Sequence, residues 1–227
     1  MYRPAPMNIP PDYGKIKFSK EEMRHILFSV VVLTIAFTLA FSGIILGERH
    51  IIGISTAEYL GFYLLVSFVA VLSGFLLHEL AHKFVAQKNG AWAEFRSFPM
   101  GLAVALFFSV LGVLFAAPGA VYIQGMISKK QNGHISIAGP VTNLVLGTGF
   151  ILIAQVFGVN DLIGYGLYLV GSINLLLAVF NLLPVPPLDG YKVLRWNLPA
   201  YIVVMAAAIV MAAGVYTGWW FSRSSHG

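Results

Sequence analysis

The sequence predicts an all-α multi-pass membrane protein, with five or six transmembrane helices and a small membrane-associated re-entrant or β element. Of its 227 residues, 58% are hydrophobic and only 10% are charged, whereas a soluble domain carries about 25% charged residues. Five segments also reach the length of about 20 apolar residues that a spanning helix needs. This chain has too little polar surface to cover a water-facing globule, so the lipid bilayer is its first expected partner.

The composition also excludes several kinds of site. The chain has no cysteine, so it contains no disulfide and no thiolate ligand, and any metal must be held by His, Asp or Glu. The net charge of +5 gathers at loop ends, as membrane orientation requires. Because no basic groove with interleaved aromatic residues is visible, we expect no nucleic-acid partner. No soluble regulatory domain is expected in this chain either.

The pattern indicates one membrane-embedded domain over residues 1–227, with its core at 56–195 and a polar, cytoplasmic N-terminal segment at 1–25. The first apolar segment is longer than the roughly 7–15 residues of a signal-peptide core, so it is expected to be a retained helix. The five spans are predicted at residues 26–46, 57–82, 137–157, 162–183 and 198–221.

The second span has clear ends. Ser55 and Glu58 fit a capping box at its start, and Asn89-Gly90 is a typical C-terminal stop. Lys83 is expected to snorkel to the inner membrane interface. The residues just before it would then lie in the inner leaflet, near the cytoplasm.

Residues 98–124 are apolar but are interrupted by Pro118-Gly119. If this stretch enters the membrane and returns, twelve of the fourteen Lys and Arg residues lie on the cytoplasmic side, and if it crosses, only nine do. The positive-inside rule therefore favours a re-entrant helix over residues 100–116, a Pro-Gly turn and an extended return over residues 120–124. A sixth full span is the alternative.

The second span carries the motif His78-Glu79-Leu80-Ala81-His82. Residues four apart lie about 40° apart around a helix, so both imidazoles can reach one ion. Glu79, beside the first histidine, is placed to act as a general base. The alternative is a pair of helix-end histidines on a polar face. A glutamate at membrane depth argues against it, because ionisable groups there are rare and usually functional.

Two histidines do not complete a catalytic zinc site, which usually has three protein ligands. Most other acidic residues lie on the outer face, in the N-terminal segment or in a cap, and Glu22 is set aside with that segment. His134 is more simply a solvated loop residue. Asp189 remains, at the cytoplasmic end of a span, and the alternative is that it N-caps the helix that follows.

Three motifs of the sequence together resemble those of one family. H-E-L-A-H, then Gly139-Pro140-Val-Thr-Asn143, then N-x-x-P-x-P-x-L-D-G from Asn181 to Gly190 are similar to the site-2 protease family, the intramembrane zinc metalloproteases of peptidase family M50. The motifs occur in the family's order. One departure is that family members commonly have a second glycine where this chain has Tyr191.

The resemblance implies one Zn²⁺ per chain, held by His78, His82 and Asp189, with Glu79 as the catalytic acid and base. It also suggests that Asn181 and Asn143 contact substrate or stabilise the oxyanion. The alternative for both amides is hydrogen bonding between helices.

The expected activity is hydrolysis of peptide bonds within or near the transmembrane segments of membrane-protein substrates, as in regulated intramembrane proteolysis. A substrate helix must unwind before its carbonyls can be attacked, and an extended segment could then pair with an exposed strand edge. The helices at 26–46 and 198–221 carry no ligand candidates and are expected to be peripheral and a possible gate. The residues expected to form the pairing edge are Ala120, Val121, Tyr122, Ile123 and Gln124.

Two other functions are the alternatives. A metal-ion transporter would need polar residues through the second span, where Ser67 and Ser73 are nearly the only ones. A catalytically inactive homologue that binds membrane proteins is disfavoured by the intact Glu79. The expected location is the cell membrane, with the N-terminus and the active-site opening on the cytoplasmic side.

Overall fold

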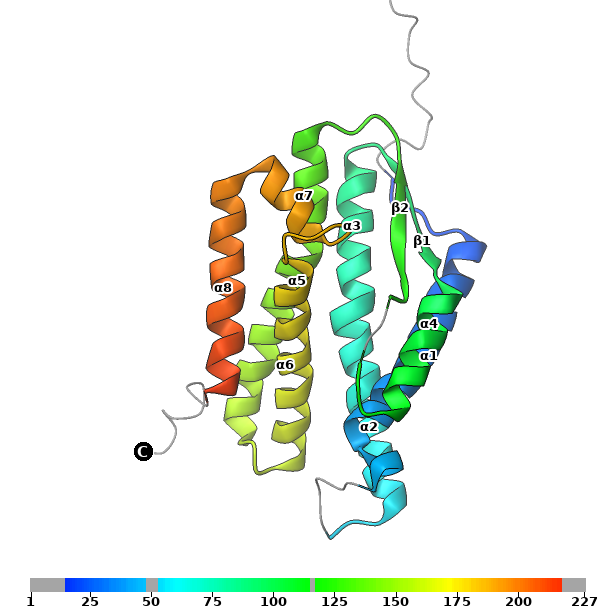
Figure 1. The fold of residues 1–227 in the computed structure, drawn as a ribbon, viewed down its shortest axis with the longest axis vertical. Helices are drawn as coiled ribbons and strands as arrows, with labels where there is room; N and C mark the ends of the chain where they lie inside the picture. The colour runs from blue at the N-terminus through cyan, green and yellow to red at the C-terminus, as the bar shows by residue number, and fades with distance from the viewer. Residues whose placement is uncertain (1–14, 48–52, 115–116, 218–227) are drawn as a thin grey trace, which may run out of the picture.

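The computed structural model describes residues 15–47, 53–114 and 117–217. The chain folds into a row of long helices with a short β-hairpin on one side (Figure 1). The elements in order are α1 (Lys20–Ser42), the 3-10 turn η1 (Ile44–Leu46), α2 (Thr56–Val71), the π-helical turn η2 (Leu72–Leu76), α3 (Leu77–Lys88), β1 (Trp92–Ser97), α4 (Pro99–Val110), β2 (Gly119–Gln124), α5 (Lys129–Phe157), α6 (Leu162–Asn181), α7 (Asp189–Trp196) and α8 (Leu198–Tyr216).

Five helices of the described chain are long and apolar enough to cross a membrane, as predicted. The second of these runs without a break through α2, η2 and α3. Its start is the predicted capping box of Ser55 and Glu58, and it ends at Lys88, before Asn89. The predicted ends at residue 116 and at residues 218–221 lie outside the described residues.

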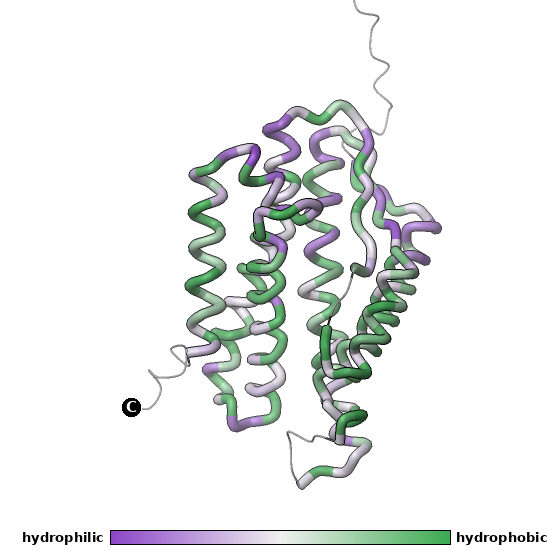
Figure 2. Tube along the Cα trace, in the orientation of Figure 1, coloured by the Kyte–Doolittle hydropathy of each residue, from purple (hydrophilic) through white to green (hydrophobic). Residues whose placement is uncertain are grey.

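Two spans begin earlier than predicted, because each has a polar first turn with its own N-cap. The Ser19 side chain accepts a hydrogen bond from the Glu22 amide and starts α1. Ser128 and Gln131 form a capping box that starts α5. Figure 2 shows these hydrophilic turns beyond the apolar parts of the helices, at the end of the molecule that also carries α7.

Residues 92–124 form a re-entrant unit and not a sixth span. Strands β1 and β2 are antiparallel, with Trp92 opposite Gln124 and Ser97 opposite Gly119, so the segment returns to the place where it began. Helix α4 has 12 residues, about 18 Å of helix against a hydrocarbon core of about 30 Å. The predicted return strand is therefore confirmed. Strand β1 was not predicted.

The apolar core has two large clusters and a smaller one around Ala86, Ala93 and Ile135. One large cluster joins α1, α2, α4 and α6, with Leu33, Val71 and Leu102 among its most buried members. The other joins α5, α6 and α8 around Ile151 and Leu175. Helix α6 contributes to both large clusters and so connects the two halves of the molecule on either side of α3.

Candidate metal centre

The two histidines of the motif lie on α3, directly after the π-helical turn η2. Such turns are rare and are frequently found at functional sites. The carbonyl of Gly74, inside this turn, accepts a hydrogen bond from Asn143 Nδ2 at 2.9 Å. The turn therefore ties the helix to α5 just before the motif begins.

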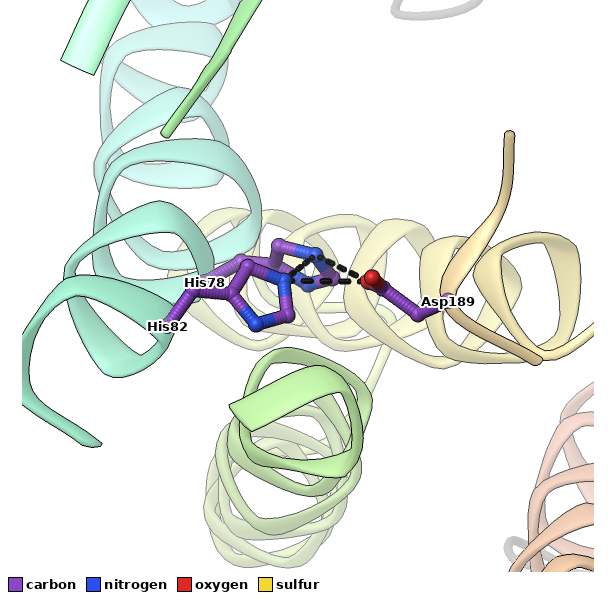
Figure 3. Close-up of side chains that lie close together, drawn as sticks. All are labelled: His78, His82 and Asp189. Atoms are coloured by element: carbon purple, nitrogen blue, oxygen red, sulfur yellow. Dashed lines mark hydrogen bonds and ion pairs between the residues drawn. The ribbon is translucent and has the colours of Figure 1, made fainter. Parts of the chain in front are cut away.

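Asp189 is the first residue of α7, and its carboxylate points at both imidazoles (Figure 3). Its Oδ2 lies 3.3 Å from His78 Nε2 and 3.0 Å from His82 Nε2. The N-cap of α7 is Leu188, which makes no side-chain cap. The alternative that Asp189 serves as a helix cap is therefore wrong.

The three side chains are buried and converge on one point. One ligand atom from each, all within 4.8 Å of one another, could hold a single metal ion. A catalytic zinc site usually has three protein ligands, such as two imidazoles and a carboxylate, and an open fourth position. The lone pairs of these three ligand atoms repel one another unless a cation or protons lie between them. The three atoms therefore fit a zinc ion.

The far side of each imidazole is also occupied. His78 Nδ1 bonds to Asn143 Oδ1, and His82 Nδ1 donates to the Ile135 carbonyl at 2.7 Å. Partners of this kind fix the tautomer and ring orientation of metal-binding histidines. Here they keep the hydrogen on Nδ1 of His82, which leaves its Nε2 free as a ligand.

Without a metal, the pKa of the Asp189 carboxyl lies well below its usual range: burial raises it, but a protonated His82 and hydrogen bonds from both imidazoles outweigh that effect. A solvent-reaching cation is also close, because Lys192 Nζ lies 3.4 Å from Asp189 Oδ1.

Two glycines of the sequence motifs are explained by close approach. A Cβ atom at Gly139 would lie 2.5 Å from His82 Nε2 and 2.6 Å from His78 Nε2, so the α5 backbone packs directly against the two imidazoles. A Cβ at Gly190 would collide with the Leu182 carbonyl. The tight contact after Asp189 thus requires one glycine, and Tyr191 takes the next position.

Glu79 lies on α3 between the ligands and the hairpin. Its Oε2 accepts a hydrogen bond of 3.0 Å from the backbone amide of Val121, in β2. The predicted edge residues form this strand, and their side chains alternate: Ala120, Tyr122 and Gln124 are exposed, whereas Val121 and Ile123 are partly buried. The structure therefore brings the predicted base and the predicted edge together.

Asn143 and Asn181 occupy different surroundings. Asn143 is fully buried, and its Nδ2 donates to Gly74 and to Asn174 Oδ1 at 3.1 Å, while its Oδ1 meets His78. Asn181 Nδ2 donates to the Leu177 carbonyl in the preceding turn, at 3.0 Å. That either amide contacts substrate stays a prediction.

Sequence reasoning missed one polar residue near the site and misplaced another. Asn174, in the apolar α6, bonds to Asn143 and to Ser73 Oγ. An amide in a spanning segment was the available signal. Lys83 does not snorkel to the interface: its side chain is fully buried and pairs with Glu22. That prediction is wrong, because it ignored a carboxylate distant in the sequence.

Comparison with known proteins decides the family. The sequence model of peptidase family M50 matches residues 159–221. Over 136 residues the chain is 46% identical to "Putative zinc metalloprotease MJ0611" of Methanocaldococcus jannaschii, covering 59% of this chain and 71% of that relative. The chain belongs to peptidase family M50. It is therefore a member of a zinc metallopeptidase family, and it has helices that can span a membrane.

Other M50 relatives agree. "Putative zinc metalloprotease YwhC" of Bacillus subtilis is 36% identical over 152 residues, which are 58% of this chain and 68% of the relative. "Zinc metalloprotease MJ0392" of Methanocaldococcus jannaschii is 31% identical over 170 residues, and the match covers 74% of this chain but only 44% of that longer relative. No solved structure gives a significant match.

The close approach of α5 to the two imidazoles in this M50 protein can be tested by substitution. Gly139→Ala should lower the zinc content of the purified protein, since the new methyl group collides with both imidazoles, and overpacking of this kind costs about 1–3 kcal/mol. Gly149→Ala on the same helix is the matched control, because a Cβ there meets nothing within 4 Å. Zinc per chain, measured by elemental analysis, should fall only in the first variant. Equal zinc in both would contradict the packing.

Proposed function

We propose that this chain is an intramembrane zinc metalloendopeptidase that hydrolyses peptide bonds within or near the transmembrane segments of membrane-protein substrates. The observation that carries the proposal is the buried cluster of His78, His82 and Asp189, with Glu79 beside it, on a helix of membrane-spanning length. Residues 1–227 act as one membrane-embedded protease domain, with the chemistry inside the core at 56–195.

In this proposal His78, His82 and Asp189 hold one zinc ion. Zinc with three such ligands acts as a Lewis acid and lowers the pKa of water to about 7. Glu79 takes a proton from the attacking water and returns it to the leaving amine. Two features support that role: Glu79 is adjacent to His78 in sequence, and its carboxylate is not part of the ligand cluster. Asn143 keeps His78 in its orientation.

The substrate would bind as an extended strand. In the register of the hairpin Phe95 faces Val121, yet both amides donate elsewhere, to Glu22 and to Glu79. The two residues are therefore a non-hydrogen-bonded pair. By the alternation of an antiparallel ladder, Ile123 also turns its amide away from β1. A substrate strand can pair with this edge by β-augmentation.

The charges support a cytoplasmic opening of the site. The end of the molecule that holds α7 and the first turn of α5 carries Lys129, Lys130, Lys192 and Arg195. By the positive-inside rule, this end faces the cytoplasm when the chain lies in the cell membrane. Water would reach the site from the same end, past Lys192, whose side chain is 42% exposed.

Helices α1 and α8, which cover most of the predicted peripheral helices 26–46 and 198–221, remain our candidates for a lateral gate. They lie on opposite flanks of the molecule (Figure 1), so they would border the entrance from two sides. A substrate segment would pass between these flanks to reach the hairpin.

Glu79→Gln tests the mechanism. The variant should keep its zinc and lose kcat for a single-span substrate by about 10²–10⁴-fold, the usual contribution of general acid-base catalysis. Zinc analysis and a cleavage assay on the same preparation provide the readout. Unchanged cleavage would refute the role of Glu79. Zinc movement across vesicles without any proteolysis would instead favour a transporter, and substrate binding without cleavage by the wild type would favour an inactive homologue.

Ile123→Pro tests strand pairing. Proline removes the outward amide of β2, so cleavage should fall by about tenfold or more while zinc content is unchanged. Ile123→Ala, which shortens the side chain but keeps the amide, is the matched control and should retain most activity. If both variants cleave equally well, the strand edge does not bind substrate.

A further inference from the structure

Helix α3 presents two neighbouring polar stripes. His78 and His82 form the first and face Asp189. Glu79, Lys83 and Gln87 are also spaced four residues apart, so they lie along one face of the helix. This second stripe faces the hairpin, since its members contact β1 or β2.

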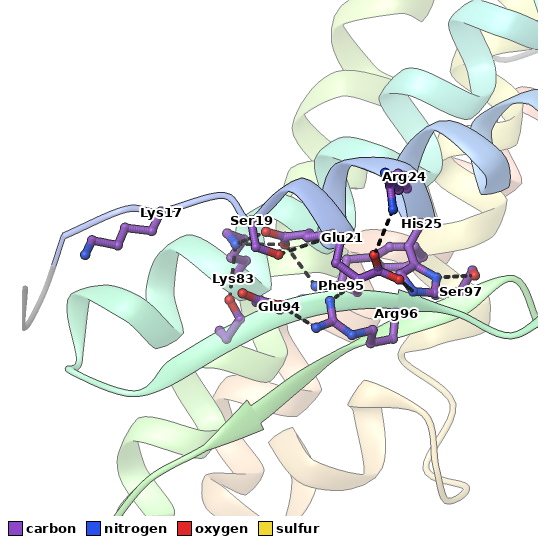
Figure 4. A network of polar contacts seen from close by, with 12 residues as sticks. Lys17, Ser19, Glu21, Arg24, His25, Lys83, Glu94, Phe95, Arg96 and Ser97 are labelled. Carbon is purple, nitrogen blue, oxygen red and sulfur yellow. Dashed lines mark hydrogen bonds and ion pairs between the residues drawn. The ribbon is translucent and has the colours of Figure 1, made fainter.

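The centre of the second stripe is a buried ion pair. Lys83 Nζ lies 2.7 and 2.6 Å from the two carboxylate oxygens of Glu22, on α1, and both side chains are fully buried. The ring of Phe18 covers the ammonium group at 4.4 Å. Figure 4 shows Lys83 beside the start of α1, and the stretch before that helix is hydrogen-bonded to α3 through Lys17 and Gln87.

The same pair holds the outer edge of β1. Glu22 Oε1 accepts the Phe95 amide at 2.9 Å, and Lys83 donates to the Ala93 carbonyl at 3.1 Å. Gln87 donates to that carbonyl as well, at 3.0 Å. Two consecutive outward positions of β1 are thus fixed to α1 and α3 together.

The opposite edge of the hairpin is fixed at the same register position. Val121 lies opposite Phe95 and gives its amide to Glu79. Two carboxylates, Glu22 on α1 and Glu79 on α3, therefore hold the hairpin from its two edges. Because Lys83 is one helical turn beyond Glu79 and is bound to Glu22, one ion pair sets the distance between the hairpin and the catalytic helix.

We propose that Glu22 and Lys83 are positioning residues for the substrate-binding strand. They hold β2 where the Val121 amide is within reach of Glu79, and an incoming substrate strand takes over that amide and leaves the Glu79 carboxylate free to act as the base. This inference rests on the proposed protease function and deepens it. It assigns Glu22 and Lys83 to substrate docking and not to the metal.

A purely stabilising role is a weaker explanation of the pair. Two charges buried together lose their hydration, and apolar replacements of similar volume are often equally stable. What an apolar pair cannot do is accept the Phe95 amide and donate to the Ala93 carbonyl. The contacts to the strand are thus the property that the charged residues supply.

The decisive variant is Glu22→Leu combined with Lys83→Met, an apolar pair that can neither accept the Phe95 amide nor donate to the Ala93 carbonyl. Each single change leaves an unpaired buried charge and is expected to unfold the protein more easily, whereas the double change removes both charges. The double variant should keep the zinc content and thermal stability of the wild type. Its KM for a single-span substrate should rise about tenfold or more, with kcat within about threefold, because binding of the strand is lost and not the chemistry.

Glu21→Leu is the matched control. It removes the same charge one residue earlier on α1, from a side chain that is 57% exposed and bound only to Arg24 and His25 among the contacts described. Its KM should equal that of the wild type. If the double variant has an unchanged KM, or loses its zinc, Glu22 and Lys83 do not position the strand and the inference is wrong.

A second readout does not depend on cleavage. The chain has no cysteine, so Tyr122→Cys gives a single thiol on the exposed face of β2. Its disulfide yield with a substrate carrying one cysteine should be high in the otherwise wild-type protein and should fall in the double variant. Equal yields would overturn the inference. A protein that forms the disulfide but never cleaves would refute the protease function, while the difference in yield would still support the positioning role.

Discussion

Every polar group on α3 must find a partner, because most of its surroundings are apolar, and this constraint organises the rest of the molecule. The partners come from α1, α5, α7 and the hairpin. Asp189 of α7 meets the histidines, Asn143 of α5 meets His78, and β2 meets Glu79. The α1 carboxylate of Glu22 completes the set. Helices α1, α5 and α7 and the hairpin are thus held in place against one central helix.

The consequence is a site with little freedom to deform. Helix α5 approaches so closely that Gly139 cannot carry a side chain. On the hairpin side of α3, the buried ion pair is that of Glu22 and Lys83. Removing one partner of such a pair typically costs about 3–5 kcal/mol, so a shift of the hairpin that separates the pair would be unfavourable. The candidate metal ligands and the proposed substrate-binding edge are therefore held at a fixed spacing by neighbouring stripes of a single helix.

Much of this arrangement could be predicted from local sequence, and the rest depends on distant contacts. Apolar length predicted the five spans, and the four-residue spacing of His78 and His82, with elimination and family motifs, led to Asp189. Strand β1 was missed although Ala93 and Phe95 alternate with polar residues, because a six-residue strand gives a weak signal. The pairing of Glu22 with Lys83 joins residues 61 apart, and no local pattern contains that information. The π-helical turn likewise reflects packing against α5 and α6.

The central claim is that His78, His82 and Asp189 together bind one zinc ion inside the membrane domain. X-ray absorption at the zinc edge, on purified protein with its metal content measured, tests it most directly. The account predicts one zinc per chain with two imidazole nitrogens and one carboxylate oxygen as protein ligands, and loss of that signal in Asp189→Ala. A protein that binds no zinc, or whose zinc spectrum is the same without Asp189, would contradict it.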